Sequence, residues 1–214
     1  GSYFSMATKT DGTLWAWGNN QSGQLGDGTT TNTSSPVQIG ALTDWGTSQT
    51  ASGYGWMAVK TDGTLWGCGD NTNGMIGDGT TTNRSSPVQV GALTTWAKVA
   101  CLGNATLALK TDGALWAFGS NNAGQLGQGN TTNRSSPVQV GSLTNWLTIA
   151  AGAYHTLTIK QDGTLWSWGQ NNDGQLGLGD TSNRSSPVQV GALTTWLDVV
   201  GGYSHSLAIK TDGT

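Results

Sequence analysis

The chain has 214 residues, of which 34 are glycine and 11 tryptophan, and its formal net charge is −3 because 12 acidic residues, all of them Asp, outnumber nine Lys and Arg. Gly, Asp, Asn and Thr are weak helix formers, so this composition argues against helical folds and favours an all-β chain. The chain has no concentrated basic patch and no apolar run near the roughly 20 residues of a membrane helix, so we expect neither nucleic-acid binding nor membrane insertion.

One unit is repeated along the chain. Its marker is a Leu-Trp pair that recurs at intervals of 50 or 51 residues, ending at Trp15, Trp66, Trp116 and Trp166. Self-similarity at such a period predicts a propeller, a solenoid or another array in which each unit packs on its neighbours. We therefore expect one domain over residues 1–214, with repeats at about 10–60, 61–110, 111–160 and 161–210 and a partial repeat at each end.

The strands of the unit can be predicted in chain order from the first copy. The alternating run at 205–210 is predicted as a strand, and residues 3–13 hold the first copy of this strand and of the turn that follows it. Asp11-Gly12 follows, and Asp-Gly between two such runs predicts a hairpin with a type I′ turn, in which both central residues have positive φ. Residues 14–18 form the next strand, a polar loop follows, and Pro36 opens a strand at 36–39, where a missing N–H is tolerated.

The remaining strand type is clearest at 196–200, which reads Trp-Leu-Asp-Val-Val and ends at two glycines. Four short antiparallel strands with two apolar faces describe a propeller blade, and stacked blades would bury the Trp pairs between them. The sequence therefore predicts an all-β fold, a β-propeller of four-stranded blades built from about four repeats.

The repeated motifs resemble those of the regulator of chromosome condensation (RCC1-like) repeat family. They include His-Ser-Leu-Ala at 205–208, Asp-Gly, Leu-Trp-Ser-Trp-Gly at 165–169 and Gly-Gln-Leu-Gly at 174–177. Because they recur in order over essentially the whole chain, the chain is identified as a member of that family, of bacterial or phage type. The resemblance implies a propeller, whose well-known members have seven blades.

The strand count departs from seven blades. It gives three strands of a first blade, full blades that begin at Trp45, Trp96 and Trp146, and two strands of another blade from Trp196. Residues 3–13 and 203–214 are then copies of the same piece. This duplication favours an arc of a larger propeller over closure as four blades or self-association through exposed blade edges.

No catalytic, metal or cofactor site is predicted. His155 and His205 share one repeat position, but no acid or nucleophile recurs beside them, and the resemblance implies a structural histidine at the start of a strand. Cys68 and Cys101 do not supply the four ligands of a structural zinc site. The Gly-Asp-Gly loops lack the constant carboxylates of a calcium site, so they are predicted as turns.

The turn that leads into residues 55–60, and its equivalents in the other copies, varies between copies although most of the unit is nearly identical. The copies differ at 53–56, 103–106, 153–156 and 203–206, whereas Ser-Ser-Pro-Val-Gln is the same four times. Aromatic residues at a loop rim are typical binding anchors. The candidate binding residues are Tyr54, Trp56, Tyr154, His155, Tyr203 and His205, with Tyr3 on the same rim. The alternative is drift at a tolerant turn, with the tyrosines packed on neighbouring blades.

These features favour a non-enzymatic interaction or display module that binds a protein or glycan through loops on one propeller face. Near-identical repeats and a polar surface without Glu favour an extracellular, cell-surface or virion location. The resemblance also implies alternatives: a guanine-nucleotide exchange factor for a small GTPase, or a secreted enzyme inhibitor, since secreted bacterial propellers similar to this family block β-lactamases. A purely structural repeat is a further alternative.

Overall fold

The computed structural model describes residues 3–214, in which every regular element is a β-strand. In chain order the strands are β1 (Phe4–Thr8), β2 (Leu14–Gly18), β3 (Thr33–Gln38), β4 (Trp45–Ala51), β5 (Gly55–Lys60), β6 (Leu65–Gly69), β7 (Arg84–Gln89), β8 (Trp96–Leu102), β9 (Ala105–Lys110), β10 (Leu115–Gly119), β11 (Arg134–Gln139), β12 (Ala150–Ala151), β13 (His155–Ile159), β14 (Leu165–Gly169), β15 (Arg184–Gln189), β16 (Trp196–Gly201) and β17 (Ser206–Lys210). Within this part of the chain no helix is long and apolar enough to cross a membrane.

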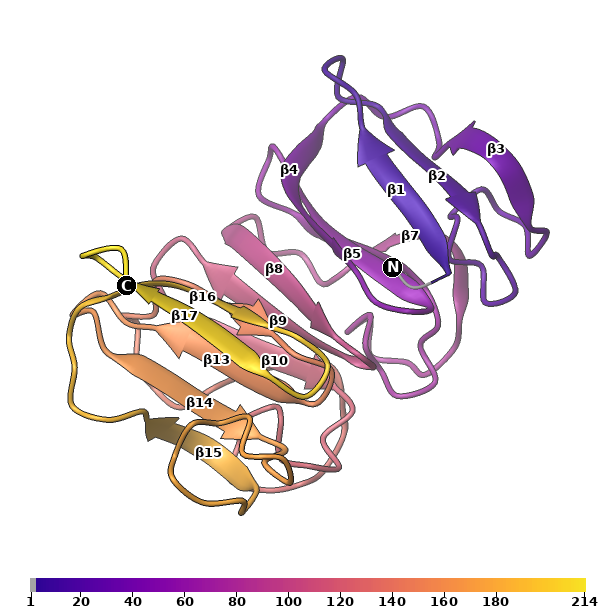
Figure 1. The fold of residues 1–214 in the computed structure, drawn as a ribbon. Helices are drawn as coiled ribbons and strands as arrows, with labels where there is room; N and C mark the ends of the chain where they lie inside the picture. Colours follow the sequence, from indigo (N-terminus) through magenta and orange to yellow (C-terminus); the bar gives the residue numbers. More distant parts are fainter. Residues whose placement is uncertain (1–2) are drawn as a thin grey trace.

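The strands form five antiparallel sheets in which neighbours in sequence are neighbours in space. The orders are β1-β2-β3, β4-β5-β6-β7, β8-β9-β10-β11, β12-β13-β14-β15 and β16-β17. The four-stranded sheets are propeller blades, so the predicted all-β propeller is confirmed. Figure 1 shows the sheets following one another, with β1–β3 and β16–β17 at opposite ends. The described residues thus form an open arc, as the strand count favours, and not a closed ring of four blades.

Each blade packs through both of its faces, because side chains alternate across a strand. On β10, Leu115 and Ala117 pack in one cluster with Trp168 of the following blade. Phe118, from the same strand, packs with Met57 and Val59 of the preceding blade. A single strand therefore contributes to two hydrophobic cores.

Adjacent blades are also joined by a hydrogen bond that recurs at one repeat position. The indole Nε1 of Trp56 on β5 donates to the carbonyl oxygen of Gln24 in the preceding blade, over 2.9 Å. Side-chain hydroxyls make the equivalent bond from Thr106 to Met75 O, from Thr156 to Gln125 O and from Ser206 to Gln175 O. The acceptor lies in the Gly-Gln-Leu-Gly motif or its variant, so this motif ties one blade to the next.

Two tryptophans and a lysine stack within each full blade. In the fourth blade the rings of Trp146 and Trp166 lie edge to face, with centroids 6.0 Å apart. Nζ of Lys160 lies 3.5 Å from the centroid of the Trp166 ring. Such cation–π contacts are worth about 0.5–1 kcal/mol at exposed sites and more when desolvated. They couple the first three strands of the blade.

The Asp-Gly hairpins lie where the sequence predicts them, but the predicted type I′ turn is wrong. Among residues 3–214 no residue other than glycine has positive φ, so Asp62 is not left-handed, whereas Gly63 has φ of 78°. Gly63 N donates to Lys60 O over 3.0 Å, as in a type I turn followed by a left-handed glycine. Oδ1 of Asp62 accepts hydrogen bonds from Thr64 N and Oγ1, and this bonding holds the Asp in its ordinary conformation.

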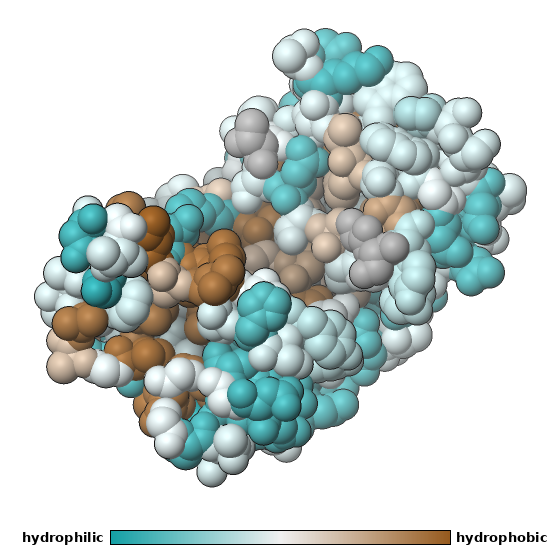
Figure 2. Space-filling model, viewed as in Figure 1, coloured by the Kyte–Doolittle hydropathy of each residue, from teal (hydrophilic) through white to brown (hydrophobic). Residues whose placement is uncertain are grey.

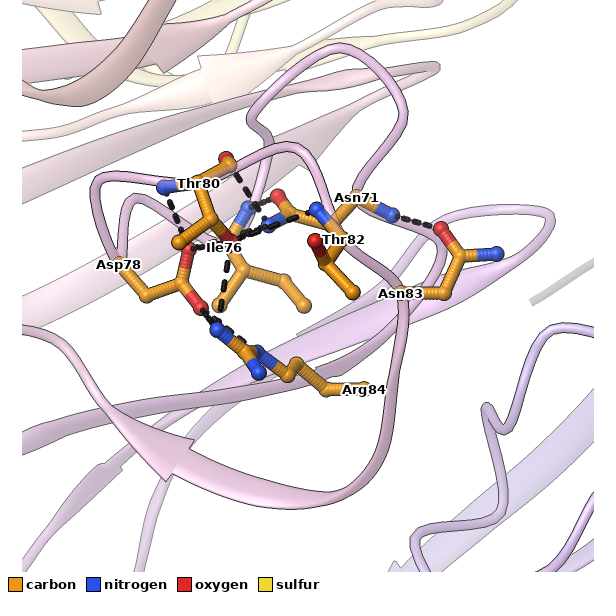
Figure 3. Close-up of polar contacts among 7 residues, drawn as sticks. All are labelled: Asn71, Ile76, Asp78, Thr80, Thr82, Asn83 and Arg84. Carbon is orange, nitrogen blue, oxygen red and sulfur yellow. Dashed lines mark hydrogen bonds and ion pairs between the residues drawn. The ribbon is translucent and has the colours of Figure 1, made fainter.

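The long loop between the third and fourth strands of a blade is organised by a buried asparagine (Figure 3). Oδ1 of Asn71 accepts from Ile76 N over 2.9 Å, and its Nδ2 donates to Asp78 Oδ1 and Thr80 O, both over 3.1 Å. Arg84 Nε donates to Asp78 Oδ2 over 2.7 Å. The same asparagine position recurs as Asn20, Asn121 and Asn171. In this loop the Asp side chain bonds protein groups and fixes the turn.

Candidate functional site

The turns between the first two strands of successive blades come together around one groove. It has a volume of about 680 Å³ and is lined by Tyr3, which precedes β1, and by residues of four sheets and the turns that join their first two strands. We call it the tyrosine groove; its lining comprises Tyr3, Ala51, Ser52, Gly53, Tyr54, Cys101, Leu102, Gly103, Asn104, Ala151, Gly152, Ala153, Tyr154, Gly201, Gly202 and Tyr203. Small residues supply most of the floor, so the aromatic side chains are its largest features.

The tyrosines of this groove form two exposed pairs. The rings of Tyr3 and Tyr54 are stacked, with centroids 5.2 Å apart, and those of Tyr154 and Tyr203 meet edge to face at 6.1 Å. Their exposed fractions are 56%, 44%, 37% and 72%, in chain order. The third blade carries Asn104 at the equivalent position, so it separates the two pairs.

Glycines let the tyrosine rings approach the neighbouring blade. A Cβ placed on Gly53 would lie 3.8 Å from Cε2 of Tyr3, and one on Gly103 would lie 3.9 Å from Cε1 of Tyr154. Each ring thus covers a turn of the adjacent blade. A larger side chain at either glycine would compete with a ring for the same surface.

The turns that carry these side chains have well-bonded backbones. The carbonyl oxygens of Tyr54, Asn104 and Tyr154 accept hydrogen bonds from the backbone N–H groups of the residues that follow the third strands, namely Asp70, Ser120 and Gln170, over 2.8–2.9 Å. Asn19 N makes the same bond to Tyr3 O over 3.0 Å. A turn fixed in this way loses little further freedom when a ligand binds, which favours affinity.

The tyrosine groove is electrically neutral. Its lining contains no Asp, Glu, Lys, Arg or His. Side-chain hydrogen bonding with Tyr3 that favours the neutral Tyr54 phenol, followed by the charge of Tyr3, raises the pKa of Tyr54 above its ordinary value. Tyr54 is therefore uncharged at neutral pH, and the groove attracts ligands through contact and hydrogen bonding.

Three of the candidate binding residues, Trp56, His155 and His205, do not line the groove, which corrects the expected rim. Trp56 is fully buried, because it stands in β5 and its indole ties two blades together. His155 is also fully buried, and its ring packs over Gly152. Burial, followed by the charge of His205, lowers the pKa of His155 to about 4. His205 is exposed and lines a different hollow, beside Gln175.

Tyr54, Tyr154 and Tyr203 are the predicted residues that the structure brings together, with Tyr3 beside them. The sequence reasoning did not single out Gly53, Gly103 or Asn104 as parts of the site. The alignment of the repeats could have identified them, because Asn104 occupies the repeat position of Tyr54 and Tyr154, and the two glycines immediately precede that position.

The described residues offer little for metal or thiol chemistry. Residues 3–214 contain no group of three or more His, Cys, Asp or Glu able to hold a metal ion. Cys68 and Cys101 are both free, and burial raises the pKa of each thiol to about 12. Both cysteines are therefore protonated thiols at neutral pH, the weakly reactive form.

The described residues form an arc of four-stranded blades, and hydrogen bonds to the Gly-Gln-Leu-Gly motif or its variant join each blade to the next. This architecture defines an RCC1-like propeller. The family model described as the RCC1-like domain matches residues 1–214, and the chain belongs to that family. It is 36% identical to Protein RCC2 of Mus musculus over 88 residues, which are 40% of this chain and 17% of that protein.

Solved structures share the fold. Human WBSCR16 matches with a TM-score of 0.86 and 24% identity over 97% of this chain and 56% of that one. Prp20p from Saccharomyces cerevisiae matches with a TM-score of 0.86 and 20% identity, over 97% of this chain and 54% of that one. The chain therefore spans about half the length of these structural relatives, and the match to Protein RCC2 covers about a sixth of that protein.

Proposed function

We propose that the protein is a non-enzymatic interaction module that binds a partner protein through the tyrosine groove. The observation that carries the proposal is the presence of two exposed tyrosine pairs on rigid turns around one groove. Tyrosine supplies large contact area at a low cost in conformational entropy, and such residues dominate binding at interfaces. A binding role agrees with what is known of a structural relative, since Prp20p binds Gsp1p and histones.

We further propose that the module is displayed on a secreted, cell-surface or virion structure of bacterial or phage origin. Only 10% of its residues are charged, and the outer surface is rich in Asn, Thr, Ser and Gln. Segments that are identical in every copy, such as Ser-Ser-Pro-Val-Gln, together with groove turns that differ between copies, support a constant scaffold with an adaptable binding face.

The test is capture of partner proteins by the immobilised chain from surface extracts of candidate host cells. The test variant carries Tyr54→Ala, Tyr154→Ala and Tyr203→Ala. The matched control carries Leu93→Ala, Leu143→Ala and Leu193→Ala, three exposed side chains of the links between blades, all outside the groove. Retained proteins are quantified by mass spectrometry.

We expect at least one protein to be retained by the wild type and the leucine control, and to fall about tenfold on the tyrosine variant, which corresponds to roughly 1.4 kcal/mol. Equal retention of every captured protein by the wild type and the tyrosine variant would overturn the proposal. Nucleotide release from Gsp1p and inhibition of a β-lactamase, measured with the same proteins, test the exchange-factor and inhibitor alternatives.

A further inference from the structure

The tyrosine groove is suited to an elongated ligand. Its lining runs from Tyr3, next to β1, across four successive sheets of the arc, and its aromatic pairs stand on either side of the third blade, at Asn104. A ligand that reaches both pairs must extend across the turn of the third blade.

Charge restricts the ligand further. Because no charged side chain lines the groove, an ionic group of a ligand would lose hydration there without gaining a partner. A segment rich in Lys, Arg, Asp or Glu is therefore disfavoured. The groove fits a neutral ligand.

The groove has few side-chain groups that can form hydrogen bonds: four phenols, the Asn104 amide and the Ser52 hydroxyl. Of these, Oγ of Ser52 already donates to Gly55 O over 3.2 Å. Gly103 N donates to Ala153 O over 2.9 Å. A glycan would bring many hydroxyl groups to a groove with few side-chain partners for them, and a buried polar group without a partner is costly.

A proline-rich peptide has the opposite character. Proline has no N–H, and a polyproline II helix is extended, has no internal hydrogen bonds and is ordered before it binds. Such segments dock in aromatic-lined grooves, where the rings pack against the proline faces. The amide of Asn104 stands midway between the two aromatic pairs, where it can donate to one carbonyl group of the peptide.

We propose that the tyrosine groove binds an uncharged, proline-rich segment of the partner protein in the polyproline II conformation. Tyr3 and Tyr54 contact one part of the segment, Tyr154 and Tyr203 contact another, and Asn104 donates to a carbonyl between them. This inference rests on the proposed function and specifies the chemistry of the partner.

The experiment titrates the 214-residue chain into fluorescein-labelled, capped decaproline and follows fluorescence anisotropy. Comparison probes are a Gly-Ser decapeptide, a decapeptide of alternating Pro and Glu, and unlabelled maltohexaose followed by calorimetry. The variants are Tyr54→Ala, Tyr154→Ala and Asn104→Ala, and His205→Ala is the control because it is exposed outside the groove. Circular dichroism of each variant verifies that the fold is retained.

We expect saturable binding of decaproline, with Kd raised at least about tenfold by each tyrosine substitution and about threefold by Asn104→Ala, and unchanged by His205→Ala. The other peptides and maltohexaose should bind at least about tenfold more weakly. Absence of decaproline binding, equal binding of the Pro-Glu peptide, preference for maltohexaose, or insensitivity to the tyrosines would each overturn the inference. A partner captured through the tyrosines without decaproline binding would leave the proposed function standing and remove only this inference.

Discussion

Nε2 of His155 lies 3.0 Å from Oγ of Ser206, which stands on β17 of the neighbouring sheet. The Ser206 hydroxyl donates its proton to Gln175 O over 2.7 Å, so it can only accept from the imidazole. The neutral His155 ring therefore carries its proton on Nε2. Nδ1 is buried and has no hydrogen-bond partner among the described residues. The geometry resembles a serine–histidine pair, but the serine is committed to a carbonyl oxygen and serves as an inter-blade tie.

We predict that the folded protein becomes less stable as the pH is lowered from 6.5 to 4, because of His155. Burial and then the charge of His205 lower its folded-state pKa to about 4 from an ordinary value of 6.5. Between these values the unfolded chain binds a proton that the folded chain does not, so the contribution is present above pH 6.5 and is lost as pH falls through 4. The loss reaches up to about 3 kcal/mol. Urea unfolding at pH 7.5 and pH 4.5 measures it.

The control for this prediction is His205→Ala, which leaves the buried imidazole in place. We expect His155→Ala to flatten the pH dependence and His205→Ala to retain most of it. Carboxylates such as Asp62, whose pKa is lowered chiefly by the hydroxyl and then the N–H of Thr64, titrate below this window. If His155→Ala unfolded with the same pH dependence as the wild type, the assignment would be wrong.

We predict that Asn71→Ala destabilises the second blade by about 2–4 kcal/mol. The substitution removes the acceptor of Ile76 N and the donor to Asp78 Oδ1 and Thr80 O, all in a buried site. An unsatisfied buried N–H or carbonyl group costs about 1–3 kcal/mol. The measurement is the change in urea midpoint. Asn73→Ala in the same loop is the control, since its amide makes only contacts of 3.4 Å, and an equal loss in both variants would contradict the prediction.

Much of the fold was predictable because its determinants are local. The period of the Leu-Trp pair, the alternation of 205–210 and the Asp-Gly turns each specify a strand or a reversal without information from other blades. The turn type was not predictable from Asp-Gly alone. The Thr that follows supplies two hydrogen bonds to the Asp carboxylate, and these decide the conformation of Asp62.

The site was less predictable because it depends on which residue begins a strand. β5 begins at Gly55 and β13 at His155, so Trp56 and His155 belong to strands and are buried between blades. A signal was present at this position, since Thr106, Thr156 and Ser206 are all hydroxyl residues able to reach across a blade. The groove itself arises where four turns and Tyr3 meet in space, and a repeat pattern in one unit does not specify that convergence.

We predict that Gly63→Ala destabilises the protein more than Gly91→Ala. Both glycines have positive φ, 78° and 61°, so each substitution carries a backbone cost of about 1–2 kcal/mol. A Cβ at Gly63 would also overlap the carbonyl oxygen of Thr94, whereas nothing lies within 4 Å of a Cβ at Gly91. Thermal unfolding of the two variants separates the cost of steric overlap with Thr94 from the cost of a positive φ at alanine. Equal losses would show that the contact with Thr94 relaxes freely.

The arc ends in an exposed apolar face on β17. Leu207 is 63% exposed on β17, whereas Leu157 at the same repeat position is 1% exposed because the next sheet covers it. Ile209 is exposed in the same way, and Figure 2 shows hydrophobic atoms gathered over this end of the molecule. At the other end of the arc, β1 presents Ser5 and Ala7 to solvent, the repeat positions that pack on a preceding blade elsewhere.

We therefore expect the 214-residue chain to self-associate head to tail, the open face of β17 in one copy packing on that of β1 in another. Exposed apolar patches favour such contacts, and a heterologous interface of this kind extends without a fixed size unless it closes into a ring. Light scattering over a range of concentrations should show a rising average mass for the wild type. Leu207→Asn with Ile209→Asn should lower that mass toward the monomer, whereas Leu193→Asn, an exposed leucine on a link, should not. A concentration-independent monomer mass for the wild type would refute the expectation and show that the two open faces do not recognise each other.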